Sequence, residues 1–304
     1  MLSDHDVALS LNGVSKRFLV SQTRPWRASE ALMHPASFIK EGLLGEPFWA
    51  LHDINISVRK GEFLGIVGQN GSGKSTLLRI MAGLSVPTTG SVKAAGRIAS
   101  LLDLGAGFHP RATGRENAFI NGLLMGLPKQ EIREKIPGIL RFAELEAFAA
   151  RPMRTYSTGM TLRLSFAVAV HVRPEIFLID EVLAVGDADF QEKCFAHFEA
   201  LKRDGVTMVL VSHDINSIER FADRVALMDS GRIREIGEPR AIISQYITEL
   251  AKRSPAARHA LGRALERARA AWRESDRFSE SEDSTGFLSE LDEPKPSAGR
   301  ERHG

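Results

Sequence analysis

The sequence has a single cysteine, almost no net charge and no long apolar run. Cys194 cannot pair within the 304-residue chain, which is typical of proteins in a reducing compartment. No stretch approaches the roughly 18 consecutive apolar residues of a membrane-spanning helix. The 40 Lys and Arg residues nearly balance the 38 Asp and Glu residues, which argues against a dedicated nucleic-acid-binding protein. These deficits exclude a disulfide-stabilised miniprotein and argue against an integral membrane protein.

The amino terminus and the bulk composition are those of an ordinary globular protein. The first ten residues, MLSDHDVALS, are acidic and have no apolar core, so they do not resemble a secretory signal. Apolar residues make up 43% of the chain and charged residues 26%, and the length fits two domains or one large domain with an appendage. We expect a cytosolic protein that reaches a membrane only through a partner.

Apolar runs that alternate with helical patterns predict an α/β fold with a parallel sheet. The runs at 63–67, 176–180 and 206–212 are typical of strands buried on both faces. The alternation at 53–59 predicts a smaller antiparallel sheet, and the helical block 110–165 predicts a separate lobe. Further strands are predicted over 7–12, 91–102, 224–228 and 232–236, and helices over 75–83, 113–127, 129–150 and 158–172.

Two segments stand apart from this pattern. Residues 19–48 are too long for an ordinary connection between strands, so we expect an insertion there. Residues 251–304 change from a basic, alanine-rich composition to an acidic, serine-rich one, which predicts a short basic helix followed by a disordered acidic segment. The sequence therefore predicts a domain over 1–250 and a tail over 251–304.

The residues from 68 to 76 fit a phosphate-binding loop. They read Gly68-Gln69-Asn70-Gly71-Ser72-Gly73-Lys74-Ser75-Thr76. Glycines let backbone amides approach phosphate oxygens, and the helix that follows offers its positive N-terminus to the same anion. Lys74 is expected to reach the β- and γ-phosphates and Ser75 to bind Mg²⁺. A plain glycine-rich turn would not also need the buried strand before it and the helix after it.

Polar residues follow two other buried strands. Asp180 and Glu181 end the run IFLIDE, where two carboxylates are costly unless they are used. We expect Asp180 to hold Mg²⁺ through water, and Glu181 to orient or deprotonate an attacking water. Because ligands bind at the carboxyl ends of parallel strands, His213 is expected to contact the γ-phosphate.

A second anion site is predicted at the N-terminus of the helix 158–172. Ser157 is a natural N-cap, and Gly159 lets an anion approach, with Thr158 between them. Such a cap is commonplace by itself, so it indicates an anion site only in combination with the other motifs.

Together these motifs resemble the ATP-binding subunits of ABC transporters. The phosphate loop, YSTGM (156–160), LIDE (178–181) and His213 stand in the order and spacing of that family. The resemblance covers about 7–247. It implies a P-loop ABC-type nucleotide-binding domain with a RecA-like core sheet, an antiparallel β subdomain and a helical subdomain over about 110–165.

The resemblance also implies how ATP is held. Two copies of the chain sandwich two ATP molecules, and each ATP lies between the phosphate loop of one copy and Ser157–Gly159 of the other. Ser157–Gly159 stand where the family has its LSGGQ-type signature. Asp187 matches the family's D-loop. Phe18 is the expected adenine-stacking aromatic, and Trp49 is the alternative.

A narrower resemblance is to the polysaccharide and polyol-phosphate export branch, which serves O-antigen, capsule and teichoic-acid exporters. The usual Q-loop glutamine is missing, and Asp103 is the nearest candidate for its Mg²⁺-binding and coupling role. Thr158 and Met160 replace the Gly and Gln of the signature, as they do in this branch. The resemblance rests on LLDLGAGFHPRATGREN (101–117), TYSTGM (155–160), IDEVLAVGDADFQEKC (179–194) and the insertion 19–48.

The resulting expectation is a homodimeric ATPase, using ATP and Mg²⁺, that lies on the cytoplasmic side of the inner membrane. It would drive a separately encoded permease to export a lipid-linked polysaccharide, with the permease docked between the helical lobe and residues 101–112. No nucleic-acid partner is expected. The alternatives are an ABC ATPase for another exported substrate, such as a lipid or drug, and a soluble one that acts on ribosomes or DNA. The tail is too short and polar for the carbohydrate-binding domain that some O-antigen subunits carry.

Overall fold

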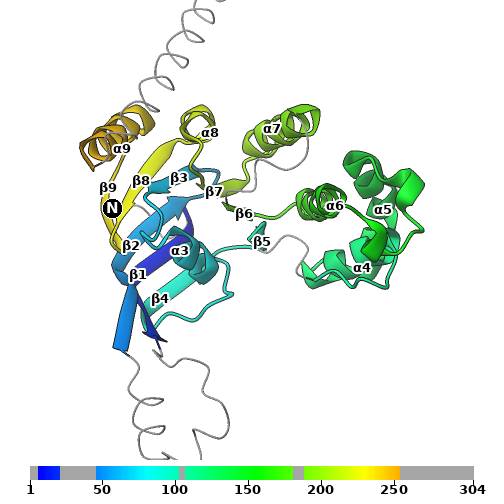
Figure 1. Cartoon of the computed structure of the whole chain (residues 1–304), viewed down its shortest axis with the longest axis horizontal. Helices are drawn as coiled ribbons and strands as arrows, with labels where there is room; N and C mark the ends of the chain where they lie inside the picture. The colour runs from blue at the N-terminus through cyan, green and yellow to red at the C-terminus, as the bar shows by residue number, and fades with distance from the viewer. Residues whose placement is uncertain (1–5, 21–45, 103–106, 181–187, 254–304) are drawn as a thin grey trace, which may run out of the picture. The chain divides into compact units, whose positions relative to one another are not determined.

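The computed structural model describes residues 6–20, 46–102, 107–180 and 188–253 (Figure 1). Its strands form a three-stranded sheet in the order β2-β1-β4 and a six-stranded sheet in the order β5-β6-β7-β3-β8-β9. The predicted α/β class and the smaller antiparallel sheet are confirmed.

The six-stranded sheet is parallel except at one edge, where β9 runs antiparallel to β8 as the predicted hairpin. β3 and β7 are buried along their whole length, as continuous apolar runs predict. In sheet order the strands are β5 (Ile98–Ser100), β6 (Ile176–Asp180), β7 (Thr207–Val211), β3 (Phe63–Gly68), β8 (Arg224–Asp229) and β9 (Arg232–Gly237).

The three-stranded sheet consists of β1 (Val7–Val20), β2 (Glu46–Arg59) and β4 (Thr89–Ala94). The predictions for β1 and β2 were too short, because the pairing of these strands shifts register between Leu11 and Val14 and again between Lys16 and Arg17. Each such bulge interrupts the alternation of apolar residues on which a strand prediction depends. The two strands expected within 91–102 lie in different sheets and do not pair with each other.

One apolar core joins both sheets to α3 (Lys74–Met81). It contains Leu9 and Leu11 of β1, Ile66 of β3 and Leu77 of α3, each no more than 1% exposed. The loop between β3 and α3 is therefore anchored at both ends in the same core.

A second apolar core holds the helical lobe, α4 (Gly114–Leu124), α5 (Lys129–Ala143) and α6 (Thr158–His171), which pack against one another (Figure 1). Thr113 and Glu116 form a capping box at the start of α4, as S/T-x-x-E spacing predicts. The predicted helix 129–150 breaks after α5 and gives way to the 3₁₀ turns η2 (Glu146–Phe148) and η3 (Met153–Thr155).

Three further helices were not predicted: α7 (Ala188–Arg203), α8 (Ile215–Phe221) and α9 (Pro239–Arg253). The chain divides into two units, Met1–Tyr246 and Ile247–Gly304. The predicted tail lies mostly outside the described residues, so the domain boundary at 250 stays a prediction. Within the described residues, no helix has the length and apolar character required to cross a membrane.

Candidate functional site

The chain turns sharply between β3 and α3, over residues 68–76. The Lys74 ammonium lies inside this turn, because the residue is 6% exposed and its Nζ donates to the backbone carbonyls of Gly68 at 2.7 Å and Gln69 at 3.0 Å. Gly73 precedes α3 in the left-handed conformation, with φ 100°, and has no side chain to cap the first amides of the helix. The turn thus combines a lysine with the uncapped start of a helix, which is the arrangement that binds phosphate.

Close packing holds this loop from one side and leaves another side open. A Cβ added to Gly68 would lie 2.3 Å from a backbone oxygen of β8, and one added to Gly73 would lie 2.7 Å from the Ala50 carbonyl oxygen. A Cβ added to Gly71 would meet nothing within 4 Å. The Ser72 hydroxyl is buried and has no hydrogen-bond partner within the described part of the chain. Because an unpaired buried hydroxyl is costly, the loop fits a bound anion.

Three strand ends meet beside the loop. Asp180 of β6 and Ile66 of β3 both pair with Val211 of β7, so β7 lies between the other two strands. Gly68 ends β3, Asp180 ends β6, and the exposed His213 follows the end of β7. The predicted convergence of these ends at one sheet edge is confirmed.

The predicted magnesium ligands are only partly described. Glu181, Asp187 and Asp103 lie outside the described residues, so their roles stay predictions. Ser75 is in the first turn of α3 and Asp180 ends β6, and these two elements are in contact. A hydroxyl and a carboxylate on neighbouring elements suit Mg²⁺, which prefers oxygen ligands. Of the remaining loop residues, Asn70 is exposed and Thr76 is half-buried.

The two candidate adenine-stacking aromatics lie on the paired strands β1 and β2. The Lys16 ammonium lies 5.2 Å from the Phe18 ring centroid, and the Arg17 guanidinium lies 5.7 Å from that of Trp49. The pairing of the two strands shifts register between Lys16 and Arg17, so the alternation of side chains along a strand does not rank one aromatic above the other. Both side chains are exposed, and the choice of Phe18 over Trp49 stays a prediction.

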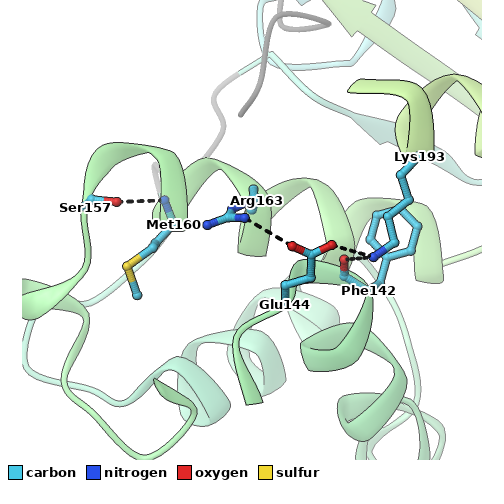
Figure 2. Close-up of polar contacts among 6 residues, drawn as sticks. All are labelled: Phe142, Glu144, Ser157, Met160, Arg163 and Lys193. Atoms are coloured by element: carbon cyan, nitrogen blue, oxygen red, sulfur yellow. Dashed lines mark hydrogen bonds and ion pairs between the residues drawn. The ribbon is translucent and has the colours of Figure 1, made fainter. Parts of the chain in front are cut away.

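The second predicted anion site lies at the start of α6. The Ser157 Oγ accepts from the Met160 backbone N–H at 3.2 Å, which confirms the predicted cap (Figure 2). Thr158 is exposed, and a Cβ added to Gly159 would meet only the Ser157 Oγ, at 3.9 Å. An anion can approach this open turn. Because α6 packs in the helical core and α3 in the sheet core, the two anion sites stand on separately packed parts of the chain.

Sequence reasoning missed the residue that shapes the loop before α4. Asn117 is fully buried, and its amide donates to three backbone carbonyls, those of His109 (3.1 Å), Ala112 (3.1 Å) and Thr113 (3.0 Å). Its oxygen accepts from the His109 N–H at 2.7 Å. One asparagine inside a helix gives no sequence signal for this role. The loop lines a groove of about 830 Å³, together with Phe119, Ile120 and Ile136 of α4 and α5.

Charged residues of both signs line this groove, namely Arg115, Arg133 and Glu116. Two further arginines lie in the segments next to it. Backbone hydrogen bonds set residues 110–114 antiparallel to 151–154 and place Arg111 opposite Arg154. Both side chains are exposed, and within the part of the chain that the structure describes neither has a carboxylate partner. Because like charges opposite each other repel, this arginine pair favours an acidic partner.

A buried strand, a loop closed by a lysine and three strand ends at one edge define a phosphate-loop nucleotide-binding protein. The profile of a family described as ABC transporter matches residues 51–184. The O-antigen export system ATP-binding protein RfbB of Klebsiella pneumoniae is 47% identical over 204 residues, which cover 67% of this chain and 83% of that protein. The chain therefore belongs to the ABC transporter family of ATP-binding proteins, as its motifs predicted.

A protein of the same name from Myxococcus xanthus is 49% identical over 197 residues, which cover 65% of this chain and 45% of that protein. The chain thus spans less than half the length of that relative. A dimeric ATP-binding cassette, solved in a post-hydrolysis state with ADP and Pi, matches with a TM-score of 0.61 at 25% identity, covering 76% of this chain and 98% of that one. The ABC cassette fold, the ABC-type ATPase class and the resemblance to the polysaccharide export branch are confirmed.

Proposed function

We propose that the chain is the ATP-hydrolysing subunit of an exporter that moves a lipid-linked polysaccharide across the inner membrane. The observation that carries the proposal is the phosphate loop, with its enclosed Lys74 and its open side at Gly71. The proposed polysaccharide substrate is supported by the similarity of the chain to two proteins named for O-antigen export.

In the proposed site, one copy binds most of the ATP molecule. Lys74 and the loop amides bind the β- and γ-phosphates, and Phe18 stacks on the adenine. Ser75 and Asp180 would hold Mg²⁺, with Asp103 as a third candidate ligand, and the ion would neutralise charge on the phosphates.

A second copy of the chain completes the proposed site. Ser157–Gly159 of one copy contact the ATP held on the phosphate loop of the other, near Asp187. Glu181 orients or deprotonates the attacking water, and His213 contacts the γ-phosphate. ATP drives the closure of the pair because it binds the closed state better than the separate copies.

The proposed permease partner docks on the groove beside α4. The groove offers the apolar side chains of Phe119, Ile120 and Ile136, and Ile120 is 39% exposed. The loop that lines it also carries Arg111, which lies opposite Arg154. An amphipathic cytoplasmic segment with acidic residues fits both features. The ATPase would then be peripheral, held on the cytoplasmic side of the membrane by its permease.

The test is to purify the tagged full chain from detergent-solubilised membranes of its native host and to identify co-purifying proteins by mass spectrometry. An integral membrane protein in a complex that hydrolyses ATP is the expected result, and its genetic neighbourhood leads to the glycan. If ribosomes or DNA-processing proteins co-purify and no membrane protein does, the transport assignment is wrong and only the ATPase activity remains supported.

A further inference from the structure

One carboxylate joins three helices at the end of α5. Glu144, the residue after α5, has φ 60° and ψ 40°, in the left-handed region that residues with side chains rarely adopt. Glycine is the usual residue at such a helix end. Glu144 therefore occupies a backbone position that suits it poorly, and its side chain has contacts that glycine cannot make.

These contacts run to two different helices (Figure 2). One oxygen of Glu144 lies 3.4 Å from Nη1 of Arg163 on α6, and the other lies 3.1 Å from Nζ of Lys193 on α7. Lys193 also donates to the Phe142 carbonyl, at 2.9 Å, in the last turn of α5. The polar contacts thus fasten α6 and α7 to the same end of α5.

An aromatic layer packs at the same junction. Phe142 of α5 stacks on Phe166 of α6 at 6.1 Å, and Phe190 of α7 meets both rings edge-on at 5.9 and 6.1 Å. Packed rings resist sliding because their volume is fixed. The ion pairs of Glu144 also limit how α6 and α7 can rotate or slide relative to the end of α5.

We propose that Glu144 is a positioning residue that fixes the start of α6 relative to α7 for ATP hydrolysis across two copies. This inference rests on the proposed function. α6 begins with Ser157–Gly159, the predicted contact to the partner's ATP, and Arg163 lies one turn beyond Gly159, on the same helix side. α7 begins at Ala188, directly after Asp187, the predicted D-loop residue. Glu144 keeps the starts of these two helices in register.

The test separates positioning from stability with two variants and a matched control. Glu144→Gly removes both ion pairs but relieves the left-handed conformation, and Glu144→Gln keeps the shape and removes the charge. Glu131→Gln is the control, since Glu131 pairs with Lys135 at 2.8 Å within α5 alone and loses the same charge. All three are made in the full chain.

We expect Glu144→Gly and Glu144→Gln to lower kcat for ATP by about fivefold, the effect of two partly exposed ion pairs. The ATP affinity of the separate copies should stay within about twofold of the wild type. In Glu144→Gly the loss of the ion pairs and the relief of the strain offset each other, so Tm should stay within about 4 °C of the wild type. Glu144→Gln keeps the strained backbone, and its Tm should fall by about 4 °C or less, because partly exposed ion pairs contribute little to stability. Hydrogen exchange should become faster in the first turns of both α6 and α7, and not in α4. Glu131→Gln should match the wild type in every readout.

Unchanged exchange in α6 and α7 in both Glu144 variants would overturn the proposal, whatever the ATPase rate. So would a kcat loss that follows a fall in Tm, which a merely structural ion pair would produce. A wild-type chain without ATPase activity would instead refute the proposed function, and the exchange measurement would still decide the role of Glu144.

Discussion

Two glycines of the phosphate loop should respond differently to the same added methyl group. Gly71 and Gly73 both have left-handed backbones, with φ 81° and 100°. A Cβ on Gly71 would meet nothing within 4 Å, whereas one on Gly73 would lie 2.7 Å from the Ala50 carbonyl oxygen and 2.9 Å from a Leu51 methyl. We predict that Gly73→Ala destabilises the fold more than Gly71→Ala does.

The size of the difference follows from these contacts. A left-handed backbone costs a residue with a side chain about 1–2 kcal/mol, which should be the whole effect of Gly71→Ala. Gly73→Ala adds contacts with a backbone oxygen, which cannot rotate away, and with the fully buried Leu51. Overpacking of this kind costs about 1–3 kcal/mol more, for a total of about 2–5 kcal/mol. Each kcal/mol corresponds to about 2–4 °C in Tm for a domain of this size.

Calorimetry of the full chain without nucleotide measures the difference in stability between the two variants. An ATP titration measures how each substitution changes ATP affinity. Gly73→Ala should also weaken ATP binding more than Gly71→Ala, because the methyl group must push the loop away from β2. Equal Tm values for the two variants would refute the reasoning, since they would show that the loop moves without cost and is not braced by β2.

Four further predictions rest on other parts of the structure. Glu181→Gln should keep ATP binding, nearly abolish hydrolysis and trap an ATP-bound dimer, and full turnover would end the assignment of this residue as the base. Burial lowers the pKa of the His197 imidazole below its usual 6.5, so the unfolded chain binds this proton more readily. Stability should therefore fall as the pH drops below about 6.5, and His197→Asn should reduce this dependence of Tm; an unchanged dependence would contradict this. Burial raises the pKa of the Cys194 thiol to about 12, so a thiol reagent at neutral pH should label it only when the chain unfolds; rapid labelling of the native protein would contradict this. Arg111→Glu combined with Arg154→Glu should release the permease in the pull-down without changing ATP affinity, and an intact complex would show that this arginine pair is not part of the docking surface.

The buried strands and their ends could be predicted because single residues mark them. β3, β6 and β7 are continuous apolar runs that stop at Gly68, Asp180 and Ser212-His213, and strands buried on both faces leave little choice of residue type. The long strands β1 and β2 were harder, because their bulges break the period that identifies a strand.

The helix α7 carried a signal that the motifs hid. Phe190, Cys194 and Phe198 are each no more than 1% exposed and recur every four residues, which is a helical period. Asn117 and Glu144 carried no such signal, because the role of each depends on backbone atoms that the fold brings to it.

The two halves of the proposed ATP site are built on different principles. The phosphate loop is fixed by close backbone contacts inside one core, where a single added carbon at Gly73 would meet a carbonyl oxygen at 2.7 Å. Ser157–Gly159 instead begin a helix of the other core, and that helix is tied to α7 by side chains, through Glu144 and the ring of Phe190. A half that must bind phosphate gains from rigidity, since its amides need a fixed geometry. The other half, which in the proposed function meets a partner copy, is held relative to α7 by partly exposed ion pairs of modest strength, so their loss should cost little stability. Substitutions in the first half should therefore change ATP affinity, and substitutions at Glu144 should change turnover.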